Sequence, residues 1–143
     1  MSKITYNLEL MNLMNLFEKV TRTRVKDCFI DESNESSLLT FVVQDYDVGR
    51  AIGKQAANVK HLESMLKKRV RILGFNNSPV QFVKGLIYPV QDAEIELSEG
   101  TIIIKAKDAK TKGFLIGRNQ SALKNNLDIV QKYFKDVHQI KII

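Results

Sequence analysis

The chain has 143 residues, of which 44% are hydrophobic and 27% charged, and its formal net charge is +6. This composition is typical of a soluble globular protein and excludes a disordered chain. The single cysteine, Cys28, excludes an internal disulfide, and with only two histidines beside it no metal site is predicted. No apolar run approaches membrane-spanning length and no signal peptide is recognisable, so we expect a cytoplasmic protein without membrane association.

The positive charge is spread evenly along the chain. Residues 1–75 contain 12 Lys/Arg and 9 Asp/Glu, and residues 76–143 contain 10 and 7. Neither half is therefore a basic tail. A modest, distributed positive charge fits a polyanionic partner, although the same charge would serve solubility alone.

Hydrophobic periodicity predicts six elements in the first half of the chain. In chain order they are a helix over 8–20, strands over 25–30 and 38–43 joined by a polar turn over 31–36, a short helix over 49–53, a long helix over 58–68 and a strand over 70–75. The long helix is expected to bury Val59, Leu62, Met65 and Leu66. Cys28 lies in an apolar run and is expected in the core.

The same order of elements is predicted again in the second half. Ser78 and Pro79 suit the N-cap and first position of a helix. The expected elements are a helix over 79–88, strands over 93–97 and 101–106, a short helix over 112–117, a long helix over 121–134 and a closing strand over 137–143.

An internal repeat links the two halves. Gly49, Ile52, Gly53 and Lys54 recur 64 positions later as Gly113, Ile116, Gly117 and Arg118, and Lys60 recurs as Lys124. A repeat of this period indicates two copies of one small unit. In each copy a glycine ends a short helix, a basic residue follows in a tight turn, and the free amides of the next helix offer an anion site.

This pattern resembles the Ile-Gly-x-x-Gly loop of the KH domain, which clamps the backbone of about four single-stranded nucleotides. The order of elements is that of the type II, prokaryotic KH fold. The resemblance therefore implies an α+β protein of two tandem type II KH domains, residues 1–76 and 77–143. Each would be α-β-β-α-α-β, with a three-stranded sheet packed on helices.

Two such units in tandem resemble the archaeal NusA-type transcription factors. The similarity extends to residues 27–31, 49–54 with 58–60, and 79–84 with Pro89. It implies a monomeric factor in transcription elongation, termination or antitermination. Its partner would be single-stranded RNA in the nascent transcript, with RNA polymerase or ribosomal proteins as further candidates.

The candidate RNA-binding residues lie in and around the two loops. In the first copy they are Arg50, Ile52, Gly53, Lys54, Gln55, Ala56 and Lys60. In the second copy they are Lys112, Ile116, Gly117, Arg118, Asn119, Gln120 and Lys124. The cations would hold phosphates, the glycines would allow close backbone approach, and the isoleucines would floor an apolar groove. Phe114 replaces Arg50 in the second copy, and is either packed inside or exposed as a base-stacking face.

Both loops depart from the family pattern, because Ala56 and Gln120 stand at the second glycine. The smaller methyl group predicts tighter binding by the first loop. Restoring glycine should improve RNA binding, more at Gln120 than at Ala56, and should slightly lower folding stability. Gln120 could instead donate a hydrogen bond to phosphate.

The departure also leaves another class of function open, a KH-fold protein-interaction scaffold with weakened or lost RNA binding. Catalysis is not predicted, and neither is a cofactor. A P-loop has four residues between its two glycines and Ser or Thr after its lysine. Here three residues separate Gly49 from Gly53, and Gln55 follows Lys54, so the segment is not a P-loop. Gly49 and Gly113 are expected to let the short helices pack closely on their neighbours.

Overall fold

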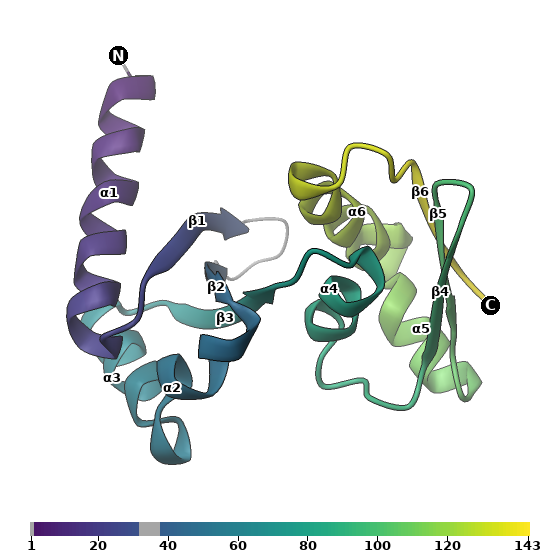
Figure 1. Cartoon of the computed structure of the whole chain (residues 1–143), viewed down its shortest axis with the longest axis horizontal. Coiled ribbons are helices and arrows are strands. Elements are labelled where there is room, and N and C mark those ends of the chain that lie inside the picture. The colour runs from purple at the N-terminus through teal and green to yellow at the C-terminus, as the bar shows by residue number, and fades with distance from the viewer. Residues whose placement is uncertain (1, 32–37) are drawn as a thin grey trace. The chain divides into compact units, whose positions relative to one another are not determined.

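The computed structural model describes residues 2–31 and 38–143, and the side chains of 8–30 and 38–143 (Figure 1). Residue contacts divide the chain into two compact units, Met1–Phe75 and Asn76–Ile143. The turn expected over 31–36 falls, beyond Asp31, outside the described residues. In the described parts of the chain, no helix combines the length and apolarity needed to cross a bilayer.

The first unit is a three-stranded sheet with helices on one face. Its elements are α1 (Ser2–Thr21), β1 (Val25–Asp31), β2 (Leu38–Gln44), α2 (Val48–Ile52), α3 (Ala57–Leu66) and β3 (Arg69–Phe75). Strand β2 is central, antiparallel to β1 and parallel to β3. Short 3-10 turns, Asp45–Asp47 and Lys54–Ala56, flank α2. The predicted order is confirmed, but α1 begins six positions before the expected start.

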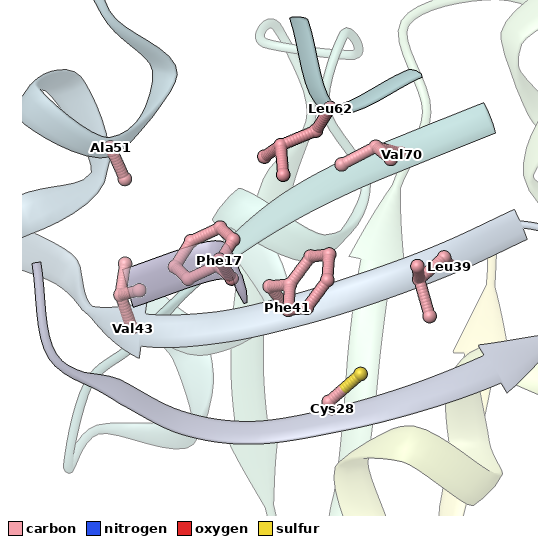
Figure 2. Close-up of a cluster of buried hydrophobic side chains, with 8 residues drawn as sticks. All are labelled: Phe17, Cys28, Leu39, Phe41, Val43, Ala51, Leu62 and Val70. Atoms are coloured by element: carbon pink, nitrogen blue, oxygen red, sulfur yellow. The ribbon is translucent and has the colours of Figure 1, made fainter. Parts of the chain in front are cut away.

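The core of this unit lies between β2 and the helices. Phe17 of α1 and Phe41 of β2 stack with ring centroids 4.3 Å apart and an interplanar angle of 18°. Figure 2 shows this pair at the centre of a cluster that also contains Leu62 of α3 and Cys28 of β1. Cys28 is buried as expected. The expectation for Met65 is wrong: α3 ends at Leu66, so Met65 lies in the last turn and is 47% exposed.

Burial, reinforced by the negative charge of Asp27, raises the pKa of the Cys28 thiol from 9.0 to about 12. The folded state therefore binds this proton more tightly than the unfolded state. The thiol's contribution to stability should be fully present below about pH 9 and lost towards pH 12, by at most about 1.4 kcal/mol per pH unit. Urea unfolding across this range should show a steeper alkaline loss for the wild type than for Cys28→Ala. Equal slopes would contradict the prediction.

The second unit has the same order of elements. They are α4 (Pro79–Leu86), β4 (Glu94–Ser98), β5 (Thr101–Lys105), α5 (Ala109–Ile116), the 3-10 turn Arg118–Gln120, α6 (Ser121–Tyr133) and β6 (Gln139–Ile142). Strand β5 is central, antiparallel to β4 and parallel to β6. Phe82 of α4 packs against Tyr133 and Phe134, each at 5.5 Å between ring centroids.

Two helix starts in this unit follow from their N-caps. The Ser78 hydroxyl accepts a hydrogen bond from the Gln81 amide at 3.4 Å, with Pro79 in the first turn, which confirms the predicted start of α4. The Asp108 carboxylate accepts from the Thr111 amide at 2.8 Å, so α5 begins at Ala109, three residues before the expected start. These contacts hold the pKa of Asp108 below its usual range.

Candidate nucleic-acid interface

The first loop (residues 53–56) joins α2 to α3 and the second loop (residues 117–120) joins α5 to α6 (Figure 1). Gly53 has φ 82° and ψ 166°, and Gly117 has φ 76° and ψ 171°. This region of backbone conformation is essentially restricted to glycine. The Gly53 amide donates to the Gly49 carbonyl at 3.0 Å, and the Gly117 amide donates to the Gly113 carbonyl at 2.9 Å. Each glycine thus ends its helix and redirects the chain.

Two successive left-handed residues follow each glycine turn. Gln55 (φ 56°, ψ 32°) precedes Ala56 (φ 61°, ψ 28°), and Asn119 (φ 55°, ψ 31°) precedes Gln120 (φ 64°, ψ 21°). A non-glycine residue in this conformation is strained by about 1–2 kcal/mol. The position where the KH motif has its second glycine therefore requires a positive φ in both loops, although it holds Ala56 and Gln120.

Glycine at either position is expected to raise the free energy of unfolding by up to about 1 kcal/mol. Relief of about 1–2 kcal/mol of strain exceeds the entropy cost of glycine, about 0.5–1 kcal/mol. The sequence-based expectation of lower stability assumed that both residues start a right-handed helix. Because both residues have a positive φ, the expected change in stability is a gain. RNA affinity should rise about five-fold more for Gln120→Gly than for Ala56→Gly, the scale of one net hydrogen bond.

The control for this prediction is Ala57→Gly, because Ala57 has φ −58° and opens α3 in the right-handed conformation. This variant should lose stability in urea unfolding. Weaker RNA binding by Gln120→Gly would show that the Gln120 side chain contacts RNA. Lower stability of Ala56→Gly and Gln120→Gly would contradict the backbone strain argued for these two positions.

Exposed cations and a helix amino end meet at each loop. Lys54 and Lys60 are exposed around the first loop, and Arg118 and Lys124 around the second. Within the described residues, neither Ala56 nor Gln120 caps its helix with a side chain. The amides of Ala57 and Ser121, which open α3 and α6, donate to the carbonyls of Lys54 and Arg118, so the free amides expected from the sequence are not found at these two positions. The helix dipole still favours negative charge at both helix amino ends. Each loop therefore combines exposed cations with the positive end of a helix dipole.

Arg50 is not placed like the other candidate cations. Its guanidinium Nη2 lies 2.8 Å from the Asp47 carboxylate, and their side chains are 64% and 15% exposed. The carboxylate offsets part of the charge of Arg50. The spacing of three residues on a helix is a signal for this pair that sequence reasoning missed. The residue of the second unit that corresponds to Arg50 is Phe114, whose side chain is 60% exposed. Lys112 of α5 is exposed.

Asn58 stabilises the end of α2. Its amide Nδ2 donates to the carbonyls of Arg50 at 3.3 Å and Ala51 at 3.1 Å. The repeat places Ala122 at this position in the second unit, and alanine cannot make these bonds. The first loop therefore has a side-chain restraint with no equivalent at position 122. Comparison of the two copies would have revealed this difference.

The isoleucines before the loops, Ile52 and Ile116, are half-buried, whereas their neighbours Ala51 and Leu115 are buried in the cores. Each isoleucine therefore keeps part of its surface open beside a loop glycine, as a groove floor requires. The expectation for Gly49 and Gly113 is wrong. A Cβ atom at either position would meet nothing within 4 Å, so neither glycine serves close helix packing.

The sheet, the paired helices and the loop between α2 and α3 define a KH domain. The KH-domain family model matches residues 14–84, which include the first loop. This chain is 25% identical to "Probable transcription termination protein NusA" of Methanocaldococcus jannaschii. The match covers all of this chain and 77% of that protein. A relative of the same name from Halococcus morrhuae is 24% identical, covering 98% of this chain and 99% of that protein.

A solved structure, "Crystal structure of APE1850", has a TM-score of 0.71 and 26% sequence identity. The match covers 95% of this chain and 99% of that chain. The chain belongs to the archaeal NusA-type KH proteins. It is thus an RNA-binding, NusA-like factor.

Proposed function

We propose that the chain binds single-stranded RNA in nascent transcripts and acts in transcription elongation, termination or antitermination. The single observation that carries the proposal is the construction of the two loops. In each, a glycine turn, an exposed cation and the amino end of a helix lie beside a half-buried isoleucine, and together they would form a phosphate site. The relatives named as transcription termination proteins support the proposed process.

We also propose that residues 77–143 form a second KH domain following a first over 1–76. The support is the shared order of elements, the shared strand pairing and the near-equal loop angles in the two units. Two domains would offer about four nucleotides' length of contact each. Each unit would then supply one loop to the RNA, and the proposed monomer would contain both.

A second candidate function is a protein-interaction scaffold that docks to RNA polymerase or ribosomal proteins. The observation that favours it is a side chain at the second glycine position of both loops, Ala56 and Gln120. Side chains there stand in the path that a phosphate backbone takes through a KH loop. The two candidates differ in one measurable property, the affinity for RNA.

A titration of the whole chain with single-stranded and duplex RNA of equal length tests the proposal. We expect binding to the single strand to be the tighter, because KH loops contact unpaired nucleotides. Fluorescence anisotropy of end-labelled RNA at several salt concentrations would measure both affinities. Equal affinity would indicate nonspecific charge, and no binding would favour the scaffold.

A further inference from the structure

A cavity of about 430 Å³ lies in the second unit, between the segment before β4 and helix α5. Pro89, Val90 and Ala93 line one part, and Lys110, Thr111 and Phe114 of α5 line another. Its volume falls within the range of small-ligand sites. None of these residues belongs to the candidate loop residues, so the cavity is a separate feature of α5.

Phe114 gives the cavity an aromatic wall. The side chain is 60% exposed, and an exposed large apolar group is more informative than a buried one. Its position in the first unit holds Arg50, so the fold does not require an aromatic ring there. An exposed ring beside apolar Pro89, Val90 and Ala93 can stack on a flat, partly apolar ligand.

The charges around the cavity favour an anionic ligand. Lys110 is exposed in its lining, and Lys107 pairs with Asp92 at 3.5 Å. The carboxylate of Asp108 accepts from the Thr111 amide, which directs this acid to the helix amino end. Because Lys107 is paired with Asp92, Lys110 is the lining cation that a ligand would meet. A ligand with a flat ring and a negative group therefore matches the apolar wall and Lys110.

The position of Phe114 on α5 connects the cavity to the second loop. Phe114 lies three residues before Gly117, a rise of about 4.5 Å along the helix. An RNA strand held at the second loop would bring a neighbouring nucleotide within reach of this ring. A separate acidic peptide would fit the lysines, but nothing about its course would bring it to this helix.

We propose that the cavity binds one nucleotide of the RNA held at the second loop, with its base stacked on Phe114 and its phosphate at Lys110. The inference rests on the proposed RNA-binding function. It adds a base-stacking site outside the loop. Of the two alternatives for Phe114 that the sequence leaves open, it takes the exposed, base-stacking one.

An abasic scan tests the site. The whole chain is titrated with a single-stranded RNA of about 12 nucleotides, long enough for two loops at about four nucleotides each. Each position in turn lacks its base. Removing the base at one position should weaken RNA binding by the wild type about 5- to 10-fold, which is the lower range for one base stack. The same abasic RNA should bind Phe114→Ala as tightly as the complete RNA does.

Matched variants separate stacking from folding. Phe114→Tyr keeps the ring and should bind like the wild type, whereas Phe114→Leu keeps apolar volume and should lose about as much affinity as Phe114→Ala. If all three bind RNA like the wild type, the site is overturned while the proposed function stands. If the wild type binds no RNA, the proposed function fails. NMR shifts of Val90 and Ala93 with an acidic peptide but not with RNA would reassign the cavity to a protein and overturn the proposal.

Discussion

Gly117→Ala is expected to lower the free energy of unfolding by about 2–3 kcal/mol. The backbone at Gly117 has φ 76° and ψ 171°, a region whose occupation by another residue is strained by about 1–3 kcal/mol. An added Cβ would also lie 2.7 Å from the Ala122 amide nitrogen and 2.8 Å from the Ala122 Cβ. Backbone and a methyl group cannot rotate away, so the loop itself must shift. Urea unfolding followed by circular dichroism would measure the loss.

Gly53→Ala should be destabilising but less so. The backbone strain is similar, but an added Cβ would lie 3.1 Å from the Asn58 amide nitrogen, further than the 2.7 Å to the backbone at Gly117. Its other near atoms, the Asn58 Cγ and Nδ2 at 3.0 Å, belong to a side chain that can rotate. Its rotation would sacrifice the hydrogen bonds to Arg50 and Ala51.

Gly113→Ala is the matched control. Gly113 lies inside α5, where an added Cβ meets nothing within 4 Å, so alanine should stabilise the chain by about 0.5–1 kcal/mol. The opposite signs at two glycines four residues apart would show that backbone conformation, not glycine content, sets the effect. A Gly117→Ala variant no less stable than Gly113→Ala would refute this account.

The sequence predicts the order of the elements because their periodicity and punctuation are local. Gly53 and Gly117 end short helices, Pro79 begins one, and the continuous apolar runs around Phe41 and Ile102 mark the central strands. Where the prediction fails, a competing local interaction decides. Asp108 starts α5 early by accepting from the Thr111 amide, a cap that the apolar pattern alone does not show.

The conformation of the loops is less predictable than their position. Glycine normally marks a positive φ, but here Gln55 and Ala56 share that conformation without it. Sequence reasoning therefore found where side chains depart from the KH pattern, but not the sign of their effect on stability. That sign depends on the backbone that the flanking helices impose.

The side-chain partners at the site depend on geometry that single residue types do not specify. Arg50 and Lys54 are both cations next to one loop, yet Arg50 is paired with Asp47. Asn58 contacts the carbonyls that precede the loop, although it follows the loop in sequence. The exposure of Phe114, left open by the sequence, is set by the packing of its neighbour Leu115 into the core.

Reversing the loop charges with Lys54→Asp and Arg118→Asp together should reduce affinity for single-stranded RNA about 100-fold. Two charged contacts at about 1.5 kcal/mol each give this factor. Lys54 and Arg118 are both exposed, so the change should leave folding stability nearly unaltered. Anisotropy titration measures the affinity, and urea unfolding checks the stability.

The salt dependence distinguishes loop contacts from general attraction. A few phosphates at two loops predict a log-log slope of about −2 to −4 for the wild type, at about 0.7 per phosphate on a single strand. The double variant should have a slope weaker by about 1–2. Lys68→Asp with Lys135→Asp makes the same change in net charge at exposed positions outside the loops. If this control loses as much affinity and slope as the loop variant, the RNA follows another path and the assignment of Lys54 and Arg118 fails.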